Sequence, residues 1–262
     1  MIFRAFFQKT GHRSIAFFVE MGKWSILLYR VIKSTGYLLK HRRLVLDQMI
    51  KIGVDSLPLV TVVSIFTGAV ASWQAAYQFQ GVIPGAMSLD FLGAAVSAAI
   101  LIELSPVLAG IVVAGRVGAS IAAEIGTMRV TEQIDAFESL AIDPVQYLAA
   151  PRITAGWTMM PVLVIYSDFV AHLGAFLVAS FMLHISPETF FSSAKKYFLA
   201  YNVWSGLIKA FVFGGGTALI GCSIGFNTQG GAVGVGRATI QAFVFSSAFI
   251  LVGDYILATI LF

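Results

Sequence analysis

The sequence predicts an all-α polytopic membrane protein: an N-terminal interfacial amphipathic helix, five transmembrane helices, and a cytoplasmic helical segment between spans two and three. Hydrophobic residues make up 58% of the 262 residues and charged residues only 11%, whereas a soluble domain carries about 25% charged residues. The mean hydropathy of +0.86 agrees with this class. Because spans of about 20 residues fill such a length, we treat residues 1–262 as a single domain.

The positive charges are concentrated at the N-terminus. Ten of the seventeen Lys and Arg residues precede Asp55, which the positive-inside rule explains by a cytoplasmic N-terminus. The net charge of +4 therefore needs no nucleic-acid partner. The single cysteine, Cys222, allows neither a disulfide framework nor a cysteine metal cluster, and we expect no metal site.

Residues 1–45 are predicted to form the interfacial helix. Glu20, Lys23, Arg30 and Lys33 share one arc at helical spacing, and apolar residues cover much of the remainder. Such a helix lies in the membrane interface with its basic side chains at the phosphates. A short first span that tilts through the bilayer is the alternative.

The five spans are bounded by charges and turn residues. No charge occurs between Asp55 and Asp90, and one helix over that stretch, about 51 Å at 1.5 Å per residue, would exceed the bilayer core of about 30 Å. The chain must therefore turn, and Gly81, Pro84 and Gly85 mark that turn. The predicted spans are residues 54–80, 90–115, 153–184, 202–227 and 238–262.

This arrangement leaves the C-terminus outside and breaks the charge rule at one place. Lys195 and Lys196 fall in the loop between spans three and four, which the topology puts outside. They belong to a segment, residues 187–197, that we expect to form a short external interfacial helix.

Residues 120–150 form a charged cytoplasmic segment. Val130, Ile134, Phe137 and Ala141 recur at helical spacing and predict one amphipathic helix over residues 127–141. Asp143 followed by Pro144 predicts the N-cap and first residue of a second helix. A connector alone needs about two to eight residues. The segment is therefore either a coupling helix that docks on a motor subunit or a helix resting on the membrane surface.

Several motifs then identify a family. They are ELSPVLAG at residues 103–110, AGRVGASIAAEIGTMRVTEQ at residues 114–133, and the stretch from Asp143-Pro144 to Pro151-Arg152. Together they closely resemble the MlaE family, the permease subunits of ABC transporters that move lipids between membranes with MCE proteins. The likeness covers nearly the whole chain.

The resemblance implies a homodimer in the bacterial inner membrane that moves phospholipids. Two ABC ATPase subunits would bind its cytoplasmic face and an MCE-domain lipid-binding protein its outer face. The lack of a transit-like N-terminal extension favours a bacterial rather than a plastid membrane. ATP and Mg would belong to the partner ATPase, so we expect no cofactor and no enzymatic activity in this chain. Consistently, the Gly22-Lys23 pair is followed by Trp24 and is not a phosphate-binding loop.

The resemblance also assigns residues to two sites. The ATPase-coupling residues are Glu124, Met128, Arg129, Glu132, Gln133, Asp135, Phe137 and Glu138. The candidate substrate-binding residues are Glu103, Lys209, Arg237 and Asn202. A charge at mid-bilayer costs about 2.5–3.5 kcal/mol on insertion scales, so Glu103 and Lys209 should face protein or water. Lys209 could equally pair with a carboxylate, and Arg237 could be an inner-face anchor.

Other polar residues within the spans leave a second hypothesis open. Asp168 and His172, four residues apart, favour an interhelical polar contact over a metal pair or proton relay, and Asp254 is expected to be a buried hydrogen-bonding group. With Glu103, the first two could form the proton path of a secondary transporter or channel, the alternative function. In the lipid permease we expect a cavity at the dimer axis, bordered by spans two, four and five.

Overall fold

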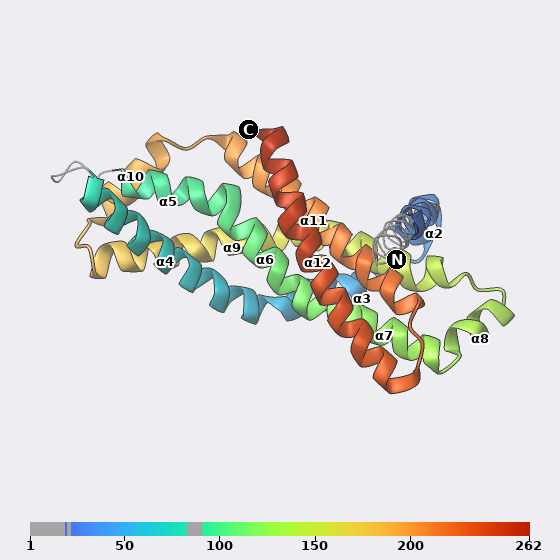
Figure 1. Cartoon of the computed structure of the whole chain (residues 1–262). Coiled ribbons are helices and arrows are strands. Elements are labelled where there is room, and N and C mark those ends of the chain that lie inside the picture. Colours follow the sequence, from blue (N-terminus) through green and yellow to red (C-terminus); the bar gives the residue numbers. More distant parts are fainter. Residues whose placement is uncertain (1–18, 20–21, 83–90) are drawn as a thin grey trace, which may run out of the picture.

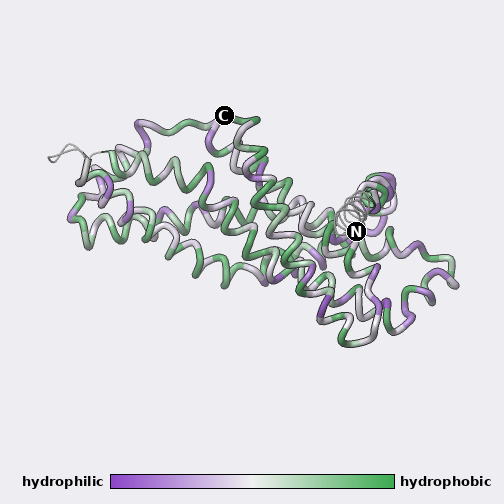
Figure 2. The backbone as a smooth tube through the Cα atoms, viewed as in Figure 1, coloured by the Kyte–Doolittle hydropathy of each residue, from purple (hydrophilic) through white to green (hydrophobic). Residues whose placement is uncertain are grey.

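The computed structural model describes residues 19, 22–82 and 91–262, and these form a bundle of long helices (Figure 1). In this part of the chain, five helical stretches are long and apolar enough to cross a membrane: Arg42–Phe79, Leu92–Val130, Val145–Phe181, Ala200–Phe226 and Gly231–Leu261. Hydrophobic residues predominate along these helices, and hydrophilic stretches are frequent around α7 and α8 (Figure 2). The predicted all-α polytopic fold is confirmed.

The N-terminal segment is not one rod. Residues 22–33 are helical, Ser34 forms a turn, and α2 (Thr35–Lys40) and α3 (Arg42–Ile52) follow. The Ser34 hydroxyl donates to the carbonyl of Val31 at 2.6 Å, a local bond that competes with helix continuation. Val31 is only 1% exposed, so this helix packs on protein. The remainder of the predicted interfacial helix lies outside the described residues.

Span one consists of α3, a short 3₁₀ turn (Val54–Ser56) and α4 (Leu57–Val82). The predicted turn residue Gly81 is still helical in α4. Pro84 and Gly85, the other residues of that predicted turn, lie outside the described residues.

Span two is one continuous helical rod with two wide π-helical turns. It runs through α5 (Leu92–Ala99), η3 (Ile100–Leu104), α6 (Ser105–Val113), η4 (Ala114–Gly118) and α7 (Ala119–Val130). The first wide turn precedes Pro106, which has no N–H to offer the carbonyl of Ile102. The rod passes the predicted span end at residue 115 because Arg116 is satisfied within the protein: its guanidinium donates to Ser56 Oγ at 3.0 Å and to the carbonyl of Lys51.

The cytoplasmic segment contains two helices where we predicted one over residues 127–141. α7 ends at Val130 and α8 spans Gln133–Ser139. Between them Glu132 has a left-handed backbone with φ 60°, which no continuous right-handed helix can contain. The predicted N-cap is confirmed, because the Val145 N–H donates to Asp143 Oδ1 at 2.9 Å and starts η5 (Val145–Ala149) and α9 (Ala150–Phe181).

The remaining elements are α10 (Pro187–Lys196), α11 (Ala200–Phe226) and α12 (Gly231–Leu261). The predicted short helix after span three is present as α10, with Ser186 as its N-cap. α8 and α10 lie at opposite ends of the bundle (Figure 1). α12 starts before the predicted residue 238, directly after the left-handed turn at Gly230 and Gly231.

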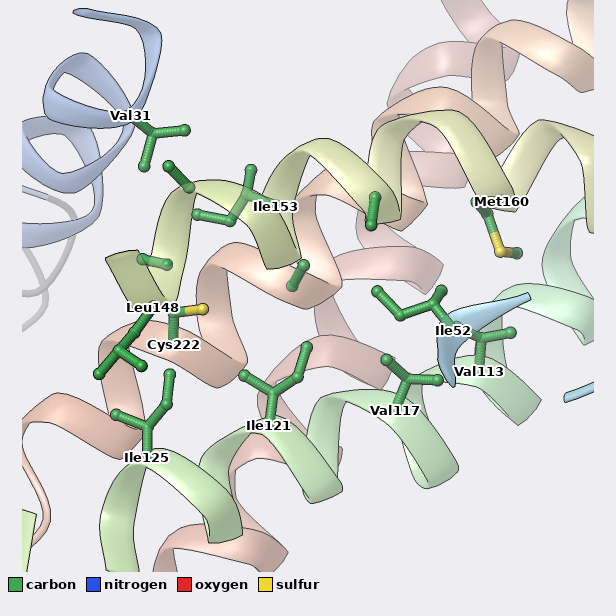
Figure 3. Packing of buried hydrophobic residues seen from close by; sticks show 14 of the residues in the cluster. Val31, Ile52, Val113, Val117, Ile121, Ile125, Leu148, Ile153, Met160 and Cys222 are labelled. Carbon is green, nitrogen blue, oxygen red and sulfur yellow. The ribbon is translucent and has the colours of Figure 1, made fainter. Parts of the chain in front are cut away.

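α9 is the central helix and packs against α4 and α11. α9 and α11 approach closely, since a Cβ on Gly214 would lie 2.3 Å from the carbonyl oxygen of Gly156. The glycines of span four therefore allow close helix packing there. The largest core cluster joins α3, α7, α9 and α11; Ile121, Ile153 and Cys222 are among its members (Figure 3).

α12 contributes least to this core. In its most apolar stretch 11% of residues are buried within the chain, against 61% for α11. One long apolar helix therefore leaves most of its surface for lipid or another subunit.

Candidate functional site

A charge cluster joins spans two, four and five. The Lys209 ammonium on α11 lies 2.6 Å from Glu103 Oε1 on η3 and 2.9 Å from Asp254 Oδ1 on α12. It also donates to the carbonyl of Ile102 at 3.2 Å, the carbonyl that Pro106 leaves without its helical donor. One side chain thus closes a gap in the hydrogen-bond ladder of span two and holds two carboxylates.

The three charged groups differ in exposure. The Lys209 side chain is 0% exposed, that of Asp254 20% and that of Glu103 41%. The cation is therefore enclosed, while the Glu103 carboxylate reaches the surface of the chain. A buried ammonium is stable only with close counter-charges, so the alternative that Lys209 pairs with a carboxylate is confirmed.

Asn202 and Arg237 lie away from this cluster. Asn202 is 7% exposed and stands two turns from Lys209 on α11, about 10 Å along the helix at 1.5 Å per residue. Arg237 is exposed near the start of α12, about 26 Å along that helix from Asp254 by the same rise. The structure thus brings Glu103 and Lys209 together and leaves the other two predicted residues apart.

An apolar groove of about 770 Å³ runs between α4 and the span-two rod. Its walls include Val62, Phe66 and Val70 from α4 and Leu104 from span two, which directly follows Glu103. Gln74 and Gln78 add amides toward the end of α4. This groove lies between spans one and two and is distinct from the cavity that we expect at the dimer axis, bordered by spans two, four and five. An apolar trough with amides at one end suits an amphiphile.

A second ionic network lies at the inner end of the bundle. Arg152 on α9, 5% exposed, pairs with Glu124 Oε2 at 2.8 Å and donates to the carbonyl of Leu148 at 2.8 Å. Lys51 on α3 lies 3.8 Å from the other oxygen of Glu124. The predicted coupling residue Glu124 therefore ties three helices together within the chain. Arg152 and Lys51 were missed because their pairing depends on tertiary contacts.

The other predicted coupling residues separate into inward and outward groups. Phe137 packs on Tyr147, with ring centroids 5.4 Å apart, and Met128 packs against the core. Arg129 and Asp135 pair with each other at 2.5 Å, while Glu132, Gln133 and Glu138 are exposed.

Two further residues, Leu140 and Arg30, help to define the surface around α8. Leu140 is 72% exposed at the end of α8. The sequence analysis did not include it among the coupling residues. Its position out of phase with the buried apolar stripe is the signal that could have identified it as an outward-facing apolar residue. Arg30 of the N-terminal helix pairs with Asp143 at 3.0 Å, so this helix is joined to the cytoplasmic segment by an ion pair.

For Asp168 and His172 we expected a polar contact between helices, but the hydrogen bond of the His172 imidazole lies within α9. The His172 Nδ1 lies 2.7 Å from the backbone carbonyl oxygen of Asp168, on the same helix. The Nδ1 atom of His172 is thus engaged by the backbone of its own helix.

Comparison with known proteins covers nearly the whole chain. The family model for the permease MlaE matches residues 45–260. A probable ABC transporter permease protein of Rickettsia felis is 39% identical over 97% of this chain and 96% of its own length. The intermembrane phospholipid transport system permease protein MlaE of Haemophilus influenzae is 31% identical over 98% of this chain and 97% of its own length. The chloroplastic protein TRIGALACTOSYLDIACYLGLYCEROL 1 of Arabidopsis thaliana is 35% identical over 85% of this chain and 62% of its own length.

Proposed function

This chain belongs to the MlaE permease family of ABC transporters, and we propose that it carries phospholipids between the inner and outer membranes of a bacterial envelope. The observation that carries this proposal is the apolar groove between α4 and span two. Its walls can hold acyl chains, since each buried CH₂ is worth about 0.8 kcal/mol. Glu103 directly precedes Leu104 of the groove wall in sequence, and its partly exposed carboxylate is held by Lys209 of α11.

The energy comes from a separate ATPase, as in other ABC permeases. The face that α8 presents supports docking, because Glu132 and Glu138 surround an apolar anchor, Leu140, that is 72% exposed. Burial of one such side chain is worth about 1.5–3 kcal/mol. ATP and Mg would stay on that ATPase, and this chain would need no cofactor of its own.

Movement of α8 has a physical route to the spans. α7 is continuous with span two, and the Glu124–Arg152 pair fixes α7 to α9. A push on α8 therefore acts on the rod that carries Glu103 and on the wall of the groove. We propose that ATP-driven closure of the motor subunits changes the width of the lipid site in this way.

The full assembly would contain two copies of this chain, two ATPase subunits and an MCE-domain lipid-binding protein on the outer face. The largely uncovered α12, with Val244, Leu251 and Val252 more than half exposed, supports a second copy packed against it. Two copies would bring two Glu103 carboxylates toward one axis, where a shared lipid cavity could form.

Affinity purification from the native host in mild detergent, followed by native mass spectrometry, tests this assembly. We expect two copies of the chain with two ATPase chains, an MCE-type partner and bound phospholipid. A lone chain that moves substrate under a proton gradient without an ATPase would overturn the proposal in favour of a secondary transporter.

A further inference from the structure

Helix α10 carries two cations on the side of the membrane where the charge rule expects few. α10 lies at the opposite end of the bundle from the cytoplasmic α8 (Figure 1). Its last turn holds Lys195 and Lys196, and both side chains are exposed. Neither the proposed transport cycle nor the positive-inside rule accounts for them.

The helix is fixed rigidly on span two. The Ser193 hydroxyl accepts a hydrogen bond from the Ala94 N–H at 3.2 Å. The backbones are in contact, since a Cβ on Gly93 would lie 2.1 Å from the Phe190 carbonyl oxygen. Phe190 itself is 1% exposed. The lysines therefore project from a held platform rather than from a loose loop.

The lysines have no ion-pair partner among the residues that the structure describes. The Lys196 ammonium lies 5.5 Å from the ring centroid of Tyr197, a cation–π contact that leaves its charge uncompensated. Glu188, the one carboxylate of α10, lies in the first turn, about 10 Å along the helix from Lys195. The end of α10 is thus a locally positive surface.

Apolar side chains flank this positive surface. Phe198 is 54% exposed, Leu199 61% and Tyr201 50%. Exposed rings beside cations are typical of the boundary between hydrocarbon and headgroups, where the rings sit at the level of the phosphates. The chemistry that matches both features at once is an anionic phospholipid headgroup.

This surface and the groove both contact the outer part of span two. α10 contacts span two at Gly93 and Ala94, and Ala99 on the same rod lines the groove. Ala94 and Ala99 are about 7.5 Å apart along the helix axis but about 140° apart around it, so α10 and the groove lie on different sides of the rod. A lipid at the end of α10 can rest its tails on Phe198 and Leu199 and place its phosphate at the lysines.

We propose that Lys195 and Lys196 bind the headgroup of an anionic phospholipid at the C-terminal end of α10. The selectivity for anionic lipids among the cargo rests on the proposed transport function, but the binding itself does not. Attraction of basic residues to an anionic lipid surface is worth about fivefold in affinity for each lysine, so the pair should favour anionic over zwitterionic lipid about 25-fold.

A fluorophore placed beside the lysines tests the binding. Ser192 is exposed on α10, and Cys222 is 0% exposed, so a Ser192→Cys variant of the full chain takes the label at one site. The labelled transporter, in phosphatidylcholine nanodiscs without ATP, is titrated with phosphatidylglycerol or phosphatidylcholine that carries a spin label near the headgroup. We expect half-maximal quenching at about 25-fold less phosphatidylglycerol.

Two variants decide the cause. Lys195→Gln with Lys196→Gln should remove the preference, whereas Lys195→Arg with Lys196→Arg should keep it. The matched control, Lys33→Gln with Lys40→Gln, removes two exposed lysines from the N-terminal region and should leave the preference unchanged. Equal quenching by both lipids in the parent, or a preference that survives in the double Gln variant, would overturn the proposal. Since no ATP or ATPase is needed, this result is independent of whether the chain transports lipid.

Discussion

The Lys209 ammonium lies 2.6 Å from the Glu103 carboxylate, at the place where Pro106 interrupts the hydrogen-bond ladder of span two. The same ammonium is shielded from solvent, because the Lys209 side chain is 0% exposed. Spans two, four and five are therefore held together by one enclosed charge, and the Glu103 carboxylate is held at the surface by it.

Removal of the enclosed cation should destabilise the bundle. Lys209→Met leaves Glu103 and Asp254 without their counter-charge, and breaking a buried pair costs about 3–5 kcal/mol. Thermal unfolding in detergent, followed by size-exclusion chromatography, should show a clear fall in the midpoint. Neutralising both carboxylates as well, with Glu103→Gln and Asp254→Asn, should recover part of the loss. An unchanged midpoint in Lys209→Met would contradict the role of the pair.

Glu103→Gln separates structure from transport. The amide keeps a hydrogen-bond acceptor for Lys209, and Asp254 still balances the charge, so the fold should survive. A hydrogen bond to a charged group contributes about 1.5–3 kcal/mol, and loss of such a bond to the lipid should lower ATP-driven transfer at least about tenfold. Full transfer by this variant would show that Glu103 is structural only.

The inner ionic network should depend on Arg152 far more than on Lys51. Arg152 is 5% exposed, and Arg152→Met would lose its pair with Glu124 and its bond to Leu148, at a cost of about 3 kcal/mol. The Lys51 side chain is 56% exposed and 3.8 Å from Glu124, so Lys51→Met should cost less than about 1 kcal/mol. The thermal unfolding midpoints of the two variants, compared in the same detergent, test this order. An equal fall of the midpoint in both variants would refute it.

Leu140 should anchor the ATPase. Leu140→Ala removes apolar area worth about 1.5–3 kcal/mol, so recovery of the ATPase with the tagged chain should fall about tenfold or more. Ile165→Ala is the matched control, because Ile165 is 53% exposed on α9, away from α8. Phe137→Ala is a poorer test, since Phe137 also packs on Tyr147. Normal recovery with Leu140→Ala would remove this residue from the docking face.

Ala141→Gly should stabilise the end of the α8 segment. Ala141 has φ 57°, and the left-handed region costs a residue with a Cβ about 1–2 kcal/mol. Part of that gain is lost to the greater freedom of glycine in the unfolded chain. Hydrogen exchange of residues 133–142 should therefore slow modestly in the variant. Faster exchange would mean that the Ala141 methyl makes a stabilising contact.

Much of the fold follows from one-dimensional pattern. Five apolar stretches and the cap formed by Asp143 and Pro144 could be predicted, because each depends on neighbours along the chain. The break at Glu132 could not, since its residue type does not favour a left-handed backbone and the apolar spacing continues across it.

The site was harder to predict than the fold. Sequence placed Glu103 and Lys209 in different spans and left open whether Lys209 meets lipid or a carboxylate. Only the packing of α11 against span two and α12 shows that it meets two carboxylates. The groove between spans one and two was not predicted for the same reason. Tertiary contacts decide where two neighbouring helices separate enough to leave a groove.

Phospholipid transfer in a reconstituted system tests the central claim most directly. Proteoliposomes that contain the chain, its ATPase and its outer partner are mixed with acceptor vesicles, and transfer of a labelled phospholipid is followed with and without ATP. We predict transfer that needs both ATP and the ATPase subunit. Transfer that proceeds at the same rate without them, or that follows a proton gradient instead, would contradict the assignment as an ABC lipid permease.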